Sequence, residues 1–287
     1  MVSVYTHART DLAAEARRLV LGQEAEAARL PGVRFEEEQF AGLPLEILEI
    51  EEGEGARRLE KTPGRYYTLT LPVRFGRGDG DFERCVRAVA ELITRCLPEQ
   101  TEAVLTAALG NPDITPDALG PLAAESILVT RHLKEHRPQD FEAFCSLALC
   151  RPGVLGTTGM ESAMQVKTLC QALRPDLVLV IDALAGAEAE HLCRTVQVTD
   201  SGIAPGSGVG NNRLEFSKAS LGLPVVSIGM PTVVDAGVFG GEAVSGMFVT
   251  PRNIDSLVRA AGRVIGYGVN LALHRGISIE DVDALLG

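Results

Sequence analysis

Residues 176–184 read DLVLVIDAL, in which five apolar side chains stand between Asp176 and Asp182. Three of the five are β-branched, and apolar residues do not alternate with polar residues as they do in a half-exposed strand. The run therefore predicts a strand that is covered on both faces, as in the centre of a parallel sheet. Asp182 is then expected at the carboxyl edge of that sheet, where open α/β sheets bind their ligands.

Strand and helix patterns alternate around this centre. Residues 33–60 and 66–71 read as an antiparallel hairpin region, which follows a helix that Thr10 or Asp11 is expected to cap. Further strands are expected at 104–109, near 194–198 and at 225–228, and helices at 82–97, 115–133, 159–173 and within 251–275. This order predicts an α/β fold, with a mostly parallel twisted sheet flanked by helices and an N-terminal β-hairpin region.

The composition excludes several classes of protein. With 287 residues and 46% hydrophobic side chains, the chain can build a full core. A net charge of −11 argues against a nucleic-acid binder, which would normally have a basic face. The six cysteines form no C-x-x-C pair and are expected to be reduced thiols. The absence of a secretory signal or an apolar run of membrane length favours a cytoplasmic protein with no membrane partner.

A second carboxylate, Asp117, follows the strand expected at 104–109. Thr115 is of the right type to cap a helix there, Pro116 suits the first helical position, and the helix start would favour ionised Asp117. If the two strands are neighbours, Asp117 and Asp182 face one crevice, where one carboxyl group can act as base and the other as acid. The alternative is that Asp117 only caps a helix and Asp182 only ends a strand.

Two glycine-rich loops, at 199–211 and 152–161, can present backbone N–H groups to an oxyanion or a phosphate. The first matches neither the P-loop nor the dinucleotide-binding fingerprint, and both are compatible with plain turns. The residues expected to line the crevice from these loops and from the strand end before Asp117 are Asn111, Gly156, Thr157, Thr158, Gly206, Ser207 and Gly208.

Several motifs, in this order along residues 9–275, together resemble the spore germination protease family. They are RTDLA at 9–13, GN at 110–111, TPDALGP at 115–121, LVTRHL at 128–133, PGVLG at 152–156, IDAL at 181–184, PGSGVGN at 205–211 and PTVVDA at 231–236. The resemblance implies a phosphorylase-like or hydrogenase-maturation-protease-like fold. It also implies an atypical aspartic endopeptidase that degrades small acid-soluble spore proteins in the spore core during germination. It matches the implicated residues to Asp117 and Asp182, and it implies a homotetramer without a cofactor.

The resemblance further implies a precursor that removes its own N-terminal segment. The family cuts after an acidic residue in sequences of the type Thr-Glu-(Ile/Phe)-Ala, and residues 10–13, TDLA, have the same order of side-chain types. We therefore expect cleavage between Asp11 and Leu12, with residues 1–11 as propeptide and 12–287 as one peptidase domain. Two departures are a short segment between 236 and 249, where relatives often carry an insertion, and Ala204, where the family commonly has His.

The expected chemistry is hydrolysis without a covalent enzyme intermediate. One Asp activates a water, and the other protonates the carbonyl oxygen or the leaving amine; either residue can take either role. Two alternatives stay open. One is a metal-assisted maturation-type protease in which Asp117, Asp182 and a His bind the metal, although no ligand spacing supports it. The other is a non-enzymatic module that binds nucleosides or phosphate through a glycine-rich loop.

Overall fold

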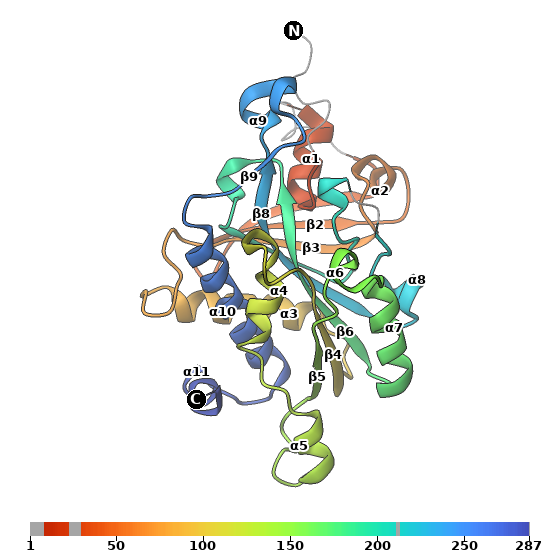
Figure 1. The fold of residues 1–287 in the computed structure, drawn as a ribbon, viewed down its shortest axis with the longest axis vertical. Coiled ribbons are helices and arrows are strands. Elements are labelled where there is room, and N and C mark those ends of the chain that lie inside the picture. Colours follow the sequence, from red (N-terminus) through yellow and green to blue (C-terminus); the bar gives the residue numbers. More distant parts are fainter. Residues whose placement is uncertain (1–8, 23–29, 211–212, 287) are drawn as a thin grey trace.

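The computed structural model describes residues 9–22, 30–210 and 213–286, which are arranged around a nine-stranded sheet (Figure 1). The order across the sheet is β1-β2-β3-β7-β8-β6-β4-β5, and β9 pairs with β8. The strands are β1 (Val33–Phe40), β2 (Leu43–Ile50), β3 (Gly64–Thr70), β4 (Ala103–Ala108), β5 (Ser146–Cys150), β6 (Leu177–Gly186), β7 (Thr195–Thr199), β8 (Val225–Asp235) and β9 (Phe248–Val249).

The predicted α/β fold is confirmed, with β6 as a central parallel strand. β8, β6, β4 and β5 run parallel, and residues 177–181 of β6 have no exposed side-chain surface. The hairpin region adds β1, β2 and β3 as an antiparallel part. β7 joins the two parts and runs antiparallel to both β3 and β8. The connection from β6 to β7 holds only a 3-10 turn, Ala189–His191, and is too short for a crossover. β7 therefore runs antiparallel to β6, with β8 between the two strands.

Helices cover both faces of the parallel part. Leu177, Leu179 and Ile181 point into a core shared with α3 (Phe82–Cys96), α4 (Leu119–Ala124) and α10 (Ile254–Leu273). Val178 and Val180 point to the opposite face, which α7 (Ser162–Leu173) and α8 (Lys218–Leu221) cover. The predicted helices at 82–97, 159–173 and 251–275 correspond to α3, α7 and α10. By the same alternation, Asp182 lies on the α7 side of the sheet.

The predicted helix at 115–133 is wrong as a single element. It is divided into a 3-10 turn, η2 (Thr115–Asp117), then α4, then α5 (Arg131–His136). In the connection, the N–H of Leu128 donates to the side chain of Asn270, and Thr130 bonds the backbone of β5 through both its N–H and its hydroxyl. These tertiary hydrogen bonds replace those of a continuous helix.

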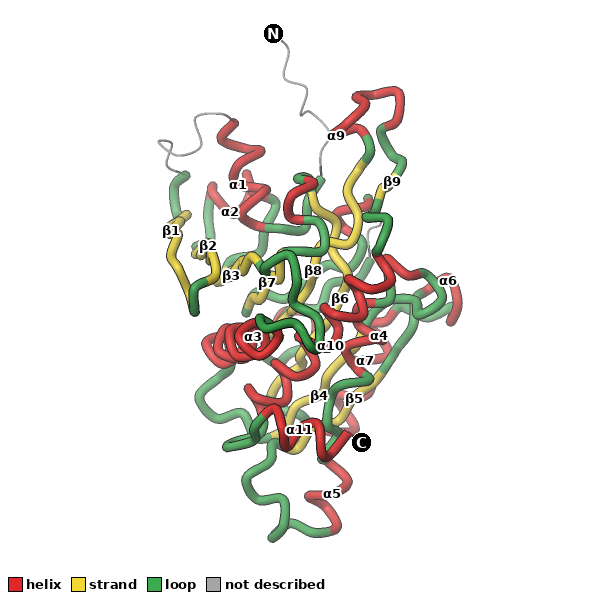
Figure 2. Tube along the Cα trace, turned by 90° about the vertical axis from the view of Figure 1, so that its left-hand side faces the viewer, coloured by secondary structure: helices red, strands yellow, loops and turns green. Residues whose placement is uncertain are grey.

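The predicted cap of the first helix is also wrong. α1 (Ala13–Leu21) is preceded by Leu12, and neither Thr10 nor Asp11 caps it. The Thr10 hydroxyl bonds Glu15, and the Asp11 carboxylate bonds the end of β6, so both side chains are occupied elsewhere. α1 and α2 (Glu54–Leu59) lie over the β1–β3 part of the sheet (Figure 2).

The two ends of the molecule are occupied by short helical segments. α9 (Gly237–Gly240) and β9 stand at one end, and α5 stands at the other (Figure 2). The short α6 (Leu155–Thr158) precedes α7, and α11 (Ile279–Leu286) ends the described chain. Within the described ranges, no helix is long and apolar enough to cross a membrane.

Candidate active site

Asp117 and Asp182 lie at the switch point of the parallel strands. The chain goes from β4 to β5 on one side, and then from β5 to β6 on the other side of β4. Open α/β sheets bind ligands in the crevice that forms beyond the carboxyl ends of such strands. Asp117 ends the η2 turn that follows β4, and Asp182 lies in β6. The two residues thus approach the crevice from neighbouring strands.

The sequence suggested that Asp182 ends its strand, but the structure shows that the strand continues beyond it. β6 continues to Gly186, whereas its pairing with β4 stops where Ala108 meets Ile181. Asp182 is therefore the first residue of β6 beyond the end of β4. The crevice exists there because β4 is the shorter strand.

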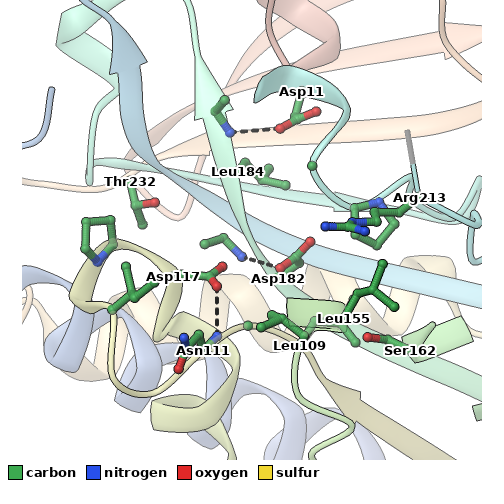
Figure 3. A pocket seen from close by; sticks show the side chains of 18 of the residues that line it. Asp11, Leu109, Asn111, Asp117, Leu155, Ser162, Asp182, Leu184, Arg213 and Thr232 are labelled. Carbon is green, nitrogen blue, oxygen red and sulfur yellow. Dashed lines mark hydrogen bonds between the residues drawn. The ribbon is translucent and has the colours of Figure 1, made fainter. Parts of the chain in front are cut away.

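Both carboxyl groups line a cavity of about 660 Å³ (Figure 3). This volume lies in the ordinary range for small-ligand sites. The β4–η2 connection, the α6 region, the end of β6, the loop after β7 and part of β8 form its walls. Of the other predicted site residues, Asp11, Asn111, Gly156 and Gly206 also line it.

Asp182 is buried, with 5% of its surface exposed. Its carboxyl group accepts a hydrogen bond from the N–H of Ala183 at 2.9 Å. Burial raises the pKa of Asp182 well above its usual value, and the charges of Asp117 and Asp11 raise it further, against the opposing effect of Ala183. These surroundings favour the protonated form of Asp182.

Asp117 is only partly buried, and its Oδ2 accepts the N–H of Asn111 at 2.8 Å. Burial raises the pKa of Asp117, and the Asn111 hydrogen bond opposes this. The helix start that was expected to favour ionised Asp117 is the single 3-10 turn η2, and burial makes the net change in the pKa upward. Gly110 permits the turn: its φ is +113°, and a Cβ there would lie 1.9 Å from the carbonyl oxygen of Asp117.

A third carboxylate, that of Asp11, reaches the same cavity. Its Oδ1 accepts the Ser207 hydroxyl at 2.6 Å and the N–H of Gly208 at 2.9 Å, and its Oδ2 accepts the N–H of Ala185 at 2.8 Å. The N–H of Asp11 donates in turn to the carbonyl of Ala185 at 2.9 Å. The segment before α1 therefore lies along the end of β6. Sequence reasoning had selected Asp11 as a cleavage residue but not as a neighbour of Asp182.

Two residues that the sequence analysis missed hold the backbone of this segment. Lys61 Nζ donates to the carbonyls of Thr10 at 2.9 Å and Asp11 at 3.1 Å. Gln197 Nε2 donates to the Asp11 carbonyl at 3.2 Å, while its Oε1 accepts the N–H of Ala13 at 2.8 Å. Burial lowers the pKa of Lys61, and the nearby carboxylates of Asp11, Glu15 and Glu60 oppose this. An amide between the two valines of β7 was a weak signal for Gln197, and no sequence signal pointed to Lys61.

Of the remaining predicted loop residues, two lie away from the cavity and two bind the side chain of Asp11. Thr157 and Thr158 are exposed, donate their hydroxyls to the carbonyl of Val154 and do not line the cavity. The hydroxyl of Ser207 and the N–H of Gly208 are occupied by Asp11, so they do not face an empty oxyanion position.

One group of side chains in the described chain has its possible metal ligands close together: Glu15, Glu188 and His191. Glu15 has no exposed surface, and its carboxylate accepts the N–H groups of Ala187 and Glu188 and lies 2.6 Å from Nδ1 of His191. Burial lowers the pKa of His191, but Glu15 and Glu188 together outweigh this effect, so that the net pKa is raised. The group attaches α1 to the β6–β7 connection. It includes neither Asp117 nor Asp182.

These features define an α/β protein with an acidic cavity at the switch point of its sheet. The chain belongs to the germination protease family, whose sequence profile matches residues 10–247. It is therefore a protease of spore germination.

Individual relatives agree with this assignment. The germination protease of Caldanaerobacter subterraneus subsp. tengcongensis is 36% identical over 97% of this chain and 98% of that protein. The germination protease of Geobacillus sp. is 38% identical over 93% of this chain and 71% of that protein. Among solved structures, the [NiFe] hydrogenase maturation protease HycI from Thermococcus kodakarensis KOD1 overlaps 62% of this chain and 98% of its own, with a TM-score of 0.37 and 16% identity.

Proposed function

We propose that this chain is an endopeptidase that starts the degradation of small acid-soluble spore proteins, and that Asp117 and Asp182 catalyse the hydrolysis. The observation that carries the proposal is the placement of two carboxyl groups in unequal surroundings on one cavity. Unequal burial gives the two carboxyl groups different pKa values. The more buried group retains its proton and can act as the acid, while the other is ionised and can act as the base.

In this mechanism the more exposed Asp117 is the base and the buried Asp182 is the acid. Asp117 takes a proton from a water as the water attacks the peptide carbonyl. Asp182 gives its proton to the carbonyl oxygen. Asp117 then passes the proton that it took from the water to the leaving nitrogen as the C–N bond breaks, and Asp182 regains a proton from the hydroxyl of the tetrahedral intermediate. Because the two groups interact, they titrate as a pair. The backbone of Gly156 or Gly206, which both line the cavity, supplies an oxyanion donor worth about 3–4 kcal/mol.

The chain is further proposed to be a zymogen that cuts itself between Asp11 and Leu12. Support comes from Asp11, which lines the same cavity as Asp182 while its carbonyl oxygen is bound by Lys61 and Gln197. Residues 1–8 of the expected propeptide lie outside the described residues. After cleavage, residues 12–287 constitute the peptidase domain, which acts in the spore core.

A homotetramer is proposed from the family resemblance. Phe239, Met247 and Phe248 in the α9–β9 segment are exposed, and apolar side chains gathered in this way are typical of association surfaces. Light scattering of the purified chain measures its mass directly. A monomer at all protein concentrations would contradict the tetramer without affecting the catalytic proposal.

The dyad is tested with Asp117→Asn and Asp182→Asn. Asp113→Asn is the matched control, since Asp113 lies exposed in the same connection but not in the cavity wall. A small acid-soluble spore protein is incubated with each variant, and its fragments are mapped by mass. Loss of cleavage in the two dyad variants, with circular dichroism unchanged, supports the mechanism; wild-type rates in both refute it. Loss of wild-type activity on chelation would instead favour the metal-assisted alternative.

A further inference from the structure

The environment of the Asp11 side chain has the properties of a carboxylate-binding subsite. Three donors from two segments converge on it: the N–H of Ala185 in β6, and the hydroxyl of Ser207 and the N–H of Gly208 in the loop after β7. Each distance is between 2.6 and 2.9 Å, as expected for bonds to an ionised carboxylate. The cavity of Asp182 adjoins this position, because Asp11 also lines it.

The backbone at residue 208 is shaped for this ligand. A Cβ on Gly208 would lie 2.5 Å from Oδ2 of Asp11 and 2.7 Å from Cβ of Ala185. Any side chain at this position would therefore fill the space that the carboxylate occupies. Glycine allows the main chain to approach closely enough for its N–H to reach the oxygen.

The donor set discriminates between an acid and its amide. A carboxylate only accepts hydrogen bonds, so it can satisfy all three donors at once. The side chain of Asn or Gln has only one oxygen that can accept. Its NH₂ group would face one of the donors of the subsite, so that donor would have no acceptor. A buried donor without a partner costs free energy, and sites built on hydrogen bonds reject such analogues strongly.

The main chain of the same residue is held independently. Lys61 and Gln197 bind the carbonyl oxygen of Asp11, and Gln197 also accepts the N–H of Ala13 on the far side of the Asp11–Leu12 bond. Side chain, carbonyl and the following backbone are thus fixed together, as in a bound peptide.

We propose that Ala185, Ser207 and Gly208 form the subsite that selects an acidic residue on the amino side of the scissile bond. The inference rests on the proposed endopeptidase function. In the precursor the chain's own Asp11 fills this subsite. Release of residues 1–11 vacates it, and the acidic residue of a substrate then takes the same three donors.

Selectivity is measured after the full chain has released residues 1–11, with two peptides that differ only in Glu or Gln before the cut. The wild-type chain is expected to prefer the Glu peptide in kcat/KM. Ser207→Ala and Gly208→Ala should each reduce that preference by about 10–100-fold, the range for a hydrogen bond to a charged group. Ser256→Ala is the matched control, because Ser256 is exposed on α10. An undiminished Glu preference in both subsite variants overturns the proposal, as does wild-type cleavage of both peptides at equal rates.

A second readout needs no proteolysis. In full-length Asp11→Ala the missing carboxylate can be supplied as formate, with formamide as the neutral counterpart. We expect formate to raise the melting temperature saturably and formamide to leave it unchanged, and Ser207→Ala in the same background to abolish the rise. Equal responses to the two additives overturn the subsite. A formate-specific rise in Asp11→Ala, together with no cleavage of any peptide by the wild-type chain after release of residues 1–11, supports the subsite and refutes the proposed endopeptidase function instead.

Discussion

Asp182 lies buried in β6 beside Asp117, which ends the η2 turn after β4. The two carboxyl groups line one cavity, although they come from different segments of the chain (Figure 3). Burial is the main cause of the raised pKa of Asp182, and the charge of Asp117 adds to it. This relationship has consequences for stability as well as for catalysis, because a buried charge is costly to the folded state.

Replacing Asp182 by Asn should stabilise the protein at neutral pH. The folded pKa of Asp182 is raised above its unfolded value. Its contribution to stability is therefore fully present below the unfolded pKa of about 3.9 and is lost as pH rises through the folded pKa. We expect Asp182→Asn to melt at least about 2 °C above wild type at pH 7, with the difference shrinking toward pH 4. Scanning calorimetry measures this, with Asp113→Asn unchanged; a lower melting temperature at pH 7 contradicts it.

The rate of peptide cleavage should depend on pH through both carboxyl groups. Activity is lost as pH rises through the pKa of Asp182, which must be protonated, and as pH falls through the pKa of Asp117, which must be ionised. Since both pKa values are raised, the acid limb should lie above the range of an ordinary Asp. Each limb changes about tenfold per pH unit. Initial kcat/KM values at constant ionic strength test this, and an acid limb below pH 3.9 would contradict it.

Gly110→Ala should displace Asp117. The new Cβ would lie 1.9 Å from the carbonyl oxygen of Asp117, at a φ of +113°. We expect cleavage to fall by about 10²-fold or more, as for a lost general base, together with destabilisation of about 1–3 kcal/mol from the strained backbone. Gly80→Ala is the control, because its Cβ meets nothing within 4 Å. Equal activity of the two variants would show that the tight turn at Gly110 does not position Asp117.

Self-cleavage should produce a chain that begins at Leu12. Intact-mass measurement of the full-length protein during maturation follows the loss of residues 1–11. Asp182→Asn should prevent the loss, and Asp113→Asn should not. Any other new N-terminus contradicts the proposed site, and processing at the normal rate in Asp182→Asn contradicts self-cleavage by the dyad.

His191→Gln should destabilise the protein in a pH-dependent way. The net pKa of His191 is raised despite the opposing effect of burial, because of Glu15. The stabilisation is fully present below the unfolded pKa of about 6.5 and is lost as pH rises through the folded pKa. We expect a melting temperature about 2–4 °C lower than wild type at pH 6, with a smaller difference at pH 9. A difference that grows with pH would contradict this ion pair.

Local patterns predicted the elements whose side chains follow a simple periodicity. The five apolar residues 177–181 form the first half of β6, and the apolar face of 82–97 forms α3. The predicted helix at 115–133 is interrupted because Thr130 bonds a strand that lies later in the chain. The cap at Thr10 or Asp11 is absent because the Thr10 hydroxyl bonds Glu15 and the Asp11 carboxylate bonds Ala185, which is far away in sequence. Such partners leave no trace in local propensity.

The sequence by itself determined the α/β fold, the family, and the choice of Asp117 and Asp182 as the two acidic residues, because periodicity and motif order are local properties of the chain. Only the tertiary structure decided that Asp117, Asp182 and Asp11 meet on one cavity, and that Lys61 and Gln197 hold the segment proposed for cleavage. The physical reason is that burial, mutual charge and hydrogen bonding depend on distances between residues that the fold brings together. The crevice itself arises from a difference in length between two paired strands, β4 and β6.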